Sequence, residues 1–215
     1  MKRNPHKTKE TILKAATKKF ALKGMAGTRV DEIAADSGLN KGMIYHYFGD
    51  KQGLYVQVLT GQMRHMFQHM QKPKGDTEYE VIHKAVETYF DYCWCNPEYI
   101  SLMLWEMVSG WNTLNCIPNE TENDVQHFLI ETIETGIKKG TFHADTNPRL
   151  FMSLAIVQIF CFFPLFKHPH LLHYRHGTDL PESEVQYYKE KVVAHVMRAL
   201  KPGVSRTLST TEEHV

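Results

Sequence analysis

The chain has 215 residues, of which 42% are hydrophobic and 23% are charged, with a formal net charge of +1. That balance fits one or two ordinary globular domains with a sizeable core. The charge is unevenly divided, because residues 1–51 contain eleven Lys/Arg against five Asp/Glu, a net charge of +6, whereas the remainder has −5. A solvated helix face would explain the lysines of one helix but not this split. We therefore expect the first 51 residues to bind a polyanion.

The sequence argues against secretion and against a membrane span. Residues 1–9 are polar and basic with no apolar run behind them, so we expect no signal peptide. The four cysteines at 93, 95, 116 and 161 have neither a disulfide-framework nor a zinc-site spacing, which predicts free thiols in a reducing cytoplasm. The most apolar run, residues 150–166, is shorter than the roughly 20 residues of a membrane span. It includes Pro164, which we expect to break it, and it suits an oligomer interface.

Helix start and stop signals follow one another along the chain, and strand-like alternation is scarce. The first helix is predicted over residues 7–23, with Gly24 as the left-handed residue that ends it. Thr28 and Asp31 form a capping-box variant before a second helix over 30–37. A third, short helix is expected over 41–48, and a fourth over about 50–70.

Later helices are predicted at about 77–95, 97–109, 120–139, 148–163 and 183–200, which makes the fold class all-α. The segment 72–75, Lys-Pro-Lys-Gly, is the clearest linker in the chain. We expect a basic head over 1–51, a connecting helix over about 50–70, and a second helical domain over 76–203. The loop 167–181 is expected to be irregular, and residues 204–215 to form a flexible tail.

Residues 30–48 have the pattern of a helix-turn-helix, whose second helix enters the major groove by its N-terminal residues. Pairs of helices joined by such turns also occur in ordinary bundles. The stretch from 28 to 51, TRVDEIAADSGLNKGMIYHYFGDK, is more specific, because it resembles the DNA-binding head of the TetR (tetracycline-repressor-like) family of transcriptional regulators. The resemblance covers about residues 8–60 and departs from the family pattern at Met43 and Gly53. The matching residues are Thr28, Ile33, Ala34, Gly38, Leu39, Lys41, Gly42, Tyr45, Tyr47, Phe48, Lys51 and Leu54.

Within this stretch, spacing predicts which side chains meet DNA. Lys41, Gly42 and Met43 lie in the first turn of the third helix, where side chains reach base edges. Tyr45 lies one turn further on, and Arg29 begins the second helix. Thr28, Tyr47 and Lys51 are the predicted phosphate contacts. By the same spacing Ile44 and Phe48 face the core, and His46 is expected to be a half-exposed packing residue.

The rest of the chain has no catalytic motif, so we predict that the protein is not an enzyme and needs no cofactor. Histidines 168, 170, 173 and 176 have irregular spacing with no carboxylate among them, which favours a polar loop over a metal site. Aromatic and Met side chains in the middle helices are most often plain core. The resemblance implies a cavity there for an apolar or aromatic effector, and the predicted lining residues are Tyr89, Trp94, Met103, Trp105, Phe128 and Phe160.

The resemblance also implies a homodimer, with the helices at 148–163 and 183–200 at the two-fold interface. A single recognition helix offers few contacts, and a dimer doubles them at a fixed spacing. The function predicted is a repressor that leaves a palindromic operator in double-stranded DNA when a small molecule binds. The alternatives are a helical enzyme and a helical adaptor that does not bind DNA.

Overall fold

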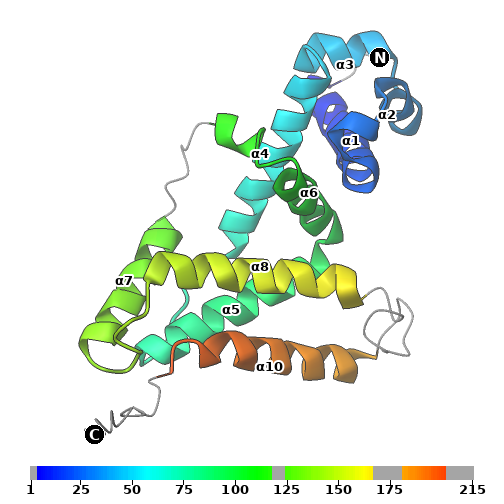
Figure 1. Cartoon of the computed structure of the whole chain (residues 1–215). Coiled ribbons are helices and arrows are strands. Elements are labelled where there is room, and N and C mark those ends of the chain that lie inside the picture. The colour runs from blue at the N-terminus through cyan, green and yellow to red at the C-terminus, as the bar shows by residue number, and fades with distance from the viewer. Residues whose placement is uncertain (1–3, 118–123, 167–180, 202–215) are drawn as a thin grey trace, which may run out of the picture.

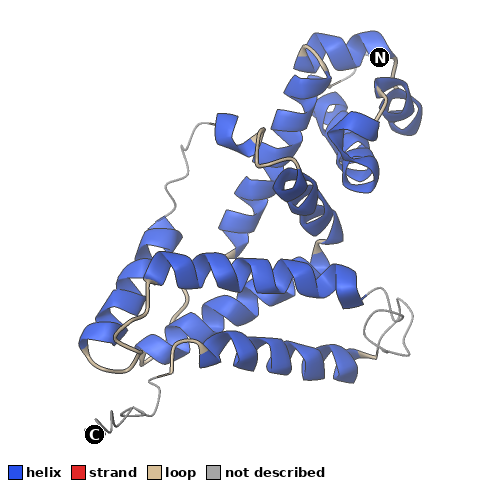
Figure 2. Ribbon diagram, in the orientation of Figure 1, coloured by secondary structure: helices blue, strands red, loops and turns tan. Residues whose placement is uncertain are grey.

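The computed structural model describes residues 4–117, 124–166 and 181–201. All secondary structure in this part of the chain is helical, as Figure 2 shows. The helices are α1 (Pro5–Gly27), α2 (Val30–Ser37), α3 (Lys41–Phe48), α4 (Lys51–His69), α5 (Glu78–Cys95), α6 (Pro97–Val108), the short 3-10 helix η1 (Leu114–Cys116), α7 (Asp124–Lys138), α8 (Pro148–Phe166) and α10 (Glu182–Arg198). The predicted all-α class is confirmed.

The helices form a small head and a larger body (Figure 1). The head contains α1, α2 and α3, and α4 runs from it down into the body. There α5 packs against α7, α8 and α10, and α8 and α10 lie against each other. The head rests on α6, which contacts α1 closely. One continuous buried cluster joins Ile12 and Phe20 of α1, through Leu54 of α4, to Met197 of α10.

The ends of the head helices follow from local chemistry. Asn40 caps α3 by accepting a hydrogen bond from the Met43 amide at 2.8 Å, and Asp50 caps α4 through the Gly53 amide at 2.7 Å. Gly24 has a φ of 66° and a ψ of 175°, so α1 changes direction there and its last residues form a separate turn. This is the position at which the sequence predicted the first helix to end.

Two local predictions were wrong. The side chain that completes the α2 capping box belongs to Glu32, which accepts from the Arg29 amide at 3.3 Å, and the Thr28 hydroxyl instead donates to the Gly24 carbonyl. Pro164 does not break α8, which continues to Phe166. A proline inside a helix removes one main-chain donor and crowds the carbonyl four residues earlier, but the turn that contains Pro164 remains helical.

No helix among the described residues is long and apolar enough to cross a membrane. The predicted loop 167–181 and the predicted tail lie almost entirely outside the described residues, as do the four histidines between 168 and 176. Elsewhere in the described chain, no group of three His, Cys, Asp or Glu side chains could hold a metal ion.

Candidate nucleic-acid interface and effector cavity

The short helix α3 has one buried face and one exposed face. Ile44 is fully buried beneath it, and Phe48 is half-buried against the same core. On the outer side Lys41 and Gly42 are exposed, and Tyr45 is 40% exposed. The first turn of α3 and the phenol one turn later are therefore directed to solvent, in the arrangement that a recognition helix requires.

An ion pair holds Lys41 beside this surface. Its ammonium lies 3.0 Å from the Asp31 carboxylate of α2 and 6.0 Å from the centre of the Tyr45 ring. The hydrogen bond that the Lys41 ammonium donates to the Asp31 carboxylate raises the pKa of Lys41, so the side chain stays charged at neutral pH. Both partners are well exposed, so water and salt screen their attraction. Lys41 can therefore exchange Asp31 for a phosphate or a guanine at little cost.

Thr28 and Lys51, two of the predicted phosphate contacts, are less accessible than the exposed face of α3. The Thr28 side chain is 1% exposed, and its hydroxyl donates to the carbonyl oxygens of Gly24 at 2.7 Å and Lys19 at 3.1 Å. This hydroxyl stabilises the turn between α1 and α2 and is buried away from solvent. Lys51 is half-buried, and its ammonium donates to the Thr28 carbonyl at 3.2 Å. Arg29 lies exposed at the N-terminus of α2.

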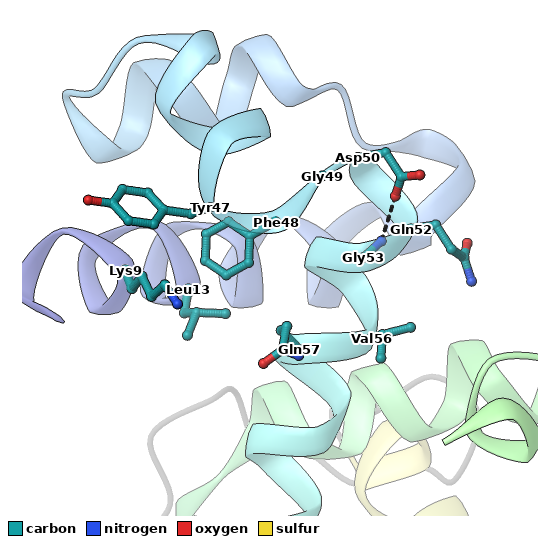
Figure 3. A pocket seen from close by; sticks show the side chains of 10 residues that line it. All are labelled: Lys9, Leu13, Tyr47, Phe48, Gly49, Asp50, Gln52, Gly53, Val56 and Gln57. Carbon is teal, nitrogen blue, oxygen red and sulfur yellow. Dashed lines mark hydrogen bonds between the residues drawn. The ribbon is translucent and has the colours of Figure 1, made fainter. Parts of the chain in front are cut away.

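A solvent-filled hollow of about 560 Å³ lies between α1, the end of α3 and the start of α4 (Figure 3). The Tyr47 ring forms one side of it, with the Lys9 ammonium 5.7 Å from the ring centre. Glutamines 52 and 57 supply amide donors, while the one carboxylate, Asp50, is occupied by capping α4. The Lys9 ammonium and the Tyr47 hydroxyl at this hollow can donate hydrogen bonds to a phosphate. Lys9 is not among the predicted phosphate contacts, although it lies one turn before Leu13, which packs against the core.

Steric crowding explains why a glycine occupies position 53, where the sequence departs from the family pattern. A Cβ atom on Gly53 would lie 2.3 Å from the carbonyl oxygen of Phe48, closer than any real contact of that kind. The turn between α3 and α4 is therefore tighter than a side chain at this position allows. The glycine is part of the geometry that places Tyr47 and the first turn of α4.

The body contains a cavity of about 540 Å³ between α4, α5, α6, η1, α7 and α8, which is a size typical of ligand pockets. Of the residues predicted to line an effector cavity, Tyr89, Met103 and Phe160 line this cavity. Trp94, Trp105 and Phe128 do not: Trp94 packs on Phe163, Phe128 lies under the Lys72 ammonium, and Trp105 faces the head. Other apolar lining residues include Met63, Met66, Phe67, Met70, Trp111 and Met152.

Two phenols meet at one end of this cavity. The hydroxyls of Tyr89 and Tyr99 lie 3.5 Å apart, and both rings lie 6.0 Å from the Phe160 ring. Burial raises the pKa of both phenols, so they are neutral donors and acceptors at pH 7. Burial also raises the pKa of Cys93, next to them, to about 12. A protonated, buried thiol reacts slowly with oxidants, which argues against a redox role for Cys93.

Helix α6 joins the cavity to the head. Met103 faces the cavity, while the Trp105 indole nitrogen donates to the Ala21 carbonyl of α1 at 3.1 Å. The next residue, Glu106, is 1% exposed, and one carboxylate oxygen accepts from the amides of Thr113 at 3.1 Å and Leu114 at 3.0 Å. Its main-chain carbonyl accepts from the Trp111 amide at 2.7 Å. One residue of α6 thus fixes the segment that contributes Trp111 and Leu114 to the cavity.

Glu106 also faces α4, the helix that enters the head. Burial, and then the charge and hydrogen bond of Glu106, raise the pKa of the Tyr55 phenol. The Tyr55 ring packs edge-on against Phe20 of α1, with the ring centres 4.9 Å apart. Contacts therefore run without a gap from the cavity lining through α6 to α1 and α4.

Two family profiles together match most of the chain. The profile "Bacterial regulatory proteins, tetR family" matches residues 12–58, and "Tetracyclin repressor-like, C-terminal domain" matches residues 79–196. The chain is 31% identical over 140 residues to the HTH-type transcriptional repressor SCO4008 of Streptomyces coelicolor, covering 64% of this chain and 69% of that protein. It is 29% identical over 144 residues to the HTH-type transcriptional repressor NicS of Pseudomonas putida, covering 65% and 68%.

Solved structures have the same fold. A tetR family transcription regulator from Shewanella superposes with a TM-score of 0.66 at 18% identity, covering 91% of this chain and 99% of that one. The ketosteroid transcriptional regulator KstR2 of Mycobacterium tuberculosis gives a TM-score of 0.66 at 18% identity, covering 91% and 95%. The exposed recognition helix, the cavity beneath it and the two matching profiles lead to one assignment: this chain belongs to the TetR family of transcriptional regulators.

Proposed function

We propose that the protein is a cytoplasmic homodimeric repressor that binds a roughly palindromic operator through α3 and leaves it when a small apolar molecule fills the cavity. The observation that supports this most is the two-sided nature of α3, with Ile44 buried beneath it and Lys41 and Tyr45 exposed above it. Two relatives, SCO4008 and NicS, are named as repressors, which supports repression as the sign of the regulation.

In the proposed complex, the first turn of α3 reads base edges in the major groove. Lys41 donates to guanine or phosphate, Gly42 allows close approach of the backbone, and Met43 contacts a thymine methyl. Tyr45 reaches the base edges or backbone next to them. Arg29 contacts the edge of the groove.

Contacts with DNA phosphates are proposed to fix the position of α3 along the major groove. Tyr47 and Lys9, which lie together at the hollow in Figure 3, contact the DNA backbone, as do the N-terminal amides of α4. Lys51 contributes mainly positive charge to the same strand, because its ammonium already donates to the Thr28 carbonyl.

The dimer is proposed to form through α8 and α10. Leu150, Leu154 and Val157 follow at spacings of four and three on one side of α8, and they are 56%, 49% and 40% exposed. Tyr187 of α10 is 54% exposed. An apolar stripe of this kind on a monomer marks an interaction surface, and a second copy would cover it while setting the distance between two recognition helices.

Release from DNA is proposed to follow a population shift. A molecule in the cavity touches Met103 on α6 and Trp111 and Leu114 on the segment that Glu106 fixes. If it favours a different position of α6, then Trp105 and Tyr55 transmit that position to α1 and α4. The two recognition helices would then be misplaced for successive major grooves.

The test begins with DNA selected from the genome of the source organism by binding to the purified protein. Fluorescence anisotropy with the selected duplex is expected to show saturable binding, and analytical ultracentrifugation is expected to show two chains per duplex. If no genomic fragment is enriched over random sequence, the DNA-binding proposal fails and a helical adaptor becomes the better account. A monomer that binds DNA as a single chain would overturn the dimer alone.

A further inference from the structure

Among the described residues that line the cavity, one side chain is charged. Apart from the two neutral phenols, Arg149 is the one ionisable group in this described lining, which includes no Asp, Glu, Lys or His. We infer that the effector is an extended apolar carboxylic acid whose carboxylate binds Arg149. This inference depends on the proposed function, since it names the class of molecule that the cavity accepts.

Arg149 is available for such a ligand. Its carbonyl accepts from the Ser153 hydroxyl at 2.9 Å, but within the described residues its guanidinium has no hydrogen bond or ion pair. The nearest acid along the chain, Asp145, is 92% exposed and lies 3.9 Å from His143. A guanidinium at the mouth of an apolar cavity is suited to a carboxylate, which it can bind through two parallel hydrogen bonds.

The electrostatics at the N-terminus of α8 also favour an anionic ligand. Arg149 is in the first turn of α8, which contains no acidic residue. A positive side chain at the N-terminus of a helix is opposed by the helix dipole, whereas an anion there is favoured. A bound carboxylate would interact favourably with both the guanidinium and the start of α8, so an anionic ligand relieves an arrangement that is otherwise unfavourable.

The shape of the cavity implies an extended molecule. Arg149, Ile156 and Phe160 lie on one face of α8 at helical spacing, and all three line the cavity. The eleven-residue separation of Arg149 and Phe160 spans roughly 16 Å at 1.5 Å per residue. Along α8 the charge therefore lies at one end, and Phe160, with the two phenols beside it, lies at the other. Met66, Met103 and other apolar side chains line the same cavity.

Other ligand charges fit less well. A cationic amphiphile would be repelled by Arg149, and the described lining offers it aromatic rings but no carboxylate. A neutral molecule of the same length would fill the apolar part but leave the guanidinium without a partner. Flexible methionines suit a range of tail shapes, so we expect selectivity for the charge at the head and tolerance along the tail.

The experiment compares three probes with the same twelve-carbon tail: dodecanoate, dodecan-1-ol and dodecyltrimethylammonium, each below its aggregation limit. Isothermal titration calorimetry with the full chain is expected to show dodecanoate binding about tenfold more tightly than the alcohol, and the ammonium most weakly. We expect only a modest preference for the acid over the alcohol, because Arg149 is at the exposed mouth of the cavity.

Variants assign the preference to one side chain. Arg149→Gln should bring dodecanoate affinity down to that of the alcohol and leave the alcohol unchanged, whereas Arg149→Lys should keep most of the preference. Arg64→Gln is the matched control, since it removes the same charge from an exposed position on α4 outside the cavity lining, and it should change neither affinity. Thermal unfolding of each variant checks that the fold is intact.

The outcomes separate this inference from the proposed function. Equal binding of the acid and the alcohol, or a preference that survives in Arg149→Gln, overturns the carboxylate inference and leaves the repressor proposal standing. Binding of neither probe overturns the inference and the effector part of the proposed function together. The effect of dodecanoate on operator affinity is measured separately by anisotropy, so that failure to bind DNA is not mistaken for failure to bind the acid.

Discussion

The indole nitrogen of Trp105 in α6 donates a hydrogen bond to the main-chain carbonyl of Ala21 in α1, 3.1 Å away. The same ring packs over Gly24, where a Cβ atom would lie 2.9 Å from it. Two residues earlier on α6, Met103 lines the cavity. A single helix therefore contacts the cavity with one face and the head with another, so a small rotation or shift of α6 would change its contacts with both.

Gly24 is the position where this contact is most sensitive. Its φ of 66° and ψ of 175° belong to a region that is essentially restricted to glycine, and an added methyl group would collide with Trp105. Gly24→Ala is expected to lower the free energy of unfolding by about 1–3 kcal/mol, measured by urea denaturation.

The matched control for this change is Gly61→Ala. Gly61 is exposed in the middle of α4, and a Cβ atom there would contact nothing within 4 Å. Alanine should raise the free energy of unfolding by about 0.5–1 kcal/mol, since glycine weakens a helix interior. Equal effects of the two substitutions would contradict the packing described for Trp105.

Glu106 gives a second test of the link between cavity and head. One of its carboxylate oxygens accepts from the amides of Thr113 and Leu114, so Glu106→Ala leaves two main-chain donors without a partner. The expected loss of stability is about 2–4 kcal/mol. Glu106→Gln retains an acceptor oxygen in the same place and should cost about half as much. If Glu106→Ala unfolded at the wild-type urea concentration, the carboxylate would not be holding this segment.

The acid sensitivity of the head should depend in part on Glu32. The hydrogen bond from Lys23, and then that from the Arg29 amide, lower the pKa of Glu32 below its ordinary value. A carboxyl group whose pKa is lower in the folded state stabilises the fold above its unfolded pKa, and the contribution is lost as the pH falls through the folded pKa.

The measurement is urea unfolding of the wild type and Glu32→Gln at several pH values between 7 and 3. The variant is expected to be less stable at pH 7 and to converge on the wild type at the acid end. Glu10→Gln is the control, because Glu10 is exposed on α1 and has no hydrogen bond or ion pair with the described residues. Parallel pH profiles for wild type and Glu32→Gln would rule out this contribution.

DNA affinity should depend on the exposed face of α3 and not on its buried face alone. Tyr45→Ala is expected to reduce operator affinity by about 1–3 kcal/mol, with little effect on stability because the ring is 40% exposed. Lys41→Gln should weaken binding and reduce the salt dependence by about one phosphate contact for each head. Lys138→Gln, an exposed charge change on α7, is the control for general electrostatics.

The sequence predicted the head closely because its signals are local. Asn40 and Asp50 cap their helices through their own nearest amides, so the bounds of α3 could be read from neighbouring residues. The Thr28 hydroxyl was misassigned because its acceptor is the carbonyl of Gly24, in a turn whose shape depends on tertiary packing. The pairing of Lys41 with Asp31, ten residues away, was equally inaccessible to a local pattern.

Three of the six residues predicted to line the cavity do line it, and the other three do not, because their placement also depends on tertiary packing. Aromatic content identified the right helices but did not show which face of each helix turns inward. Met103 and Trp105 are two residues apart, about 200° around α6, so they necessarily face different partners. Arg149 could not be predicted from the sequence, because one arginine in an apolar helix has no local signature and only the packing of α8 places it at the cavity.

The central claim, that α3 and its neighbours form a DNA-binding surface, is tested most directly by titrating a selected operator duplex with the protein at several salt concentrations. A dimer whose heads use Lys9, Lys41, Tyr47 and main-chain amides on phosphates should give a steep linear fall of log K with log salt, with a slope of about −0.9 for each phosphate contacted. We expect this slope to become shallower in Lys41→Gln. Affinity that does not change with salt, or that is the same for the operator and for unrelated DNA, would contradict the account.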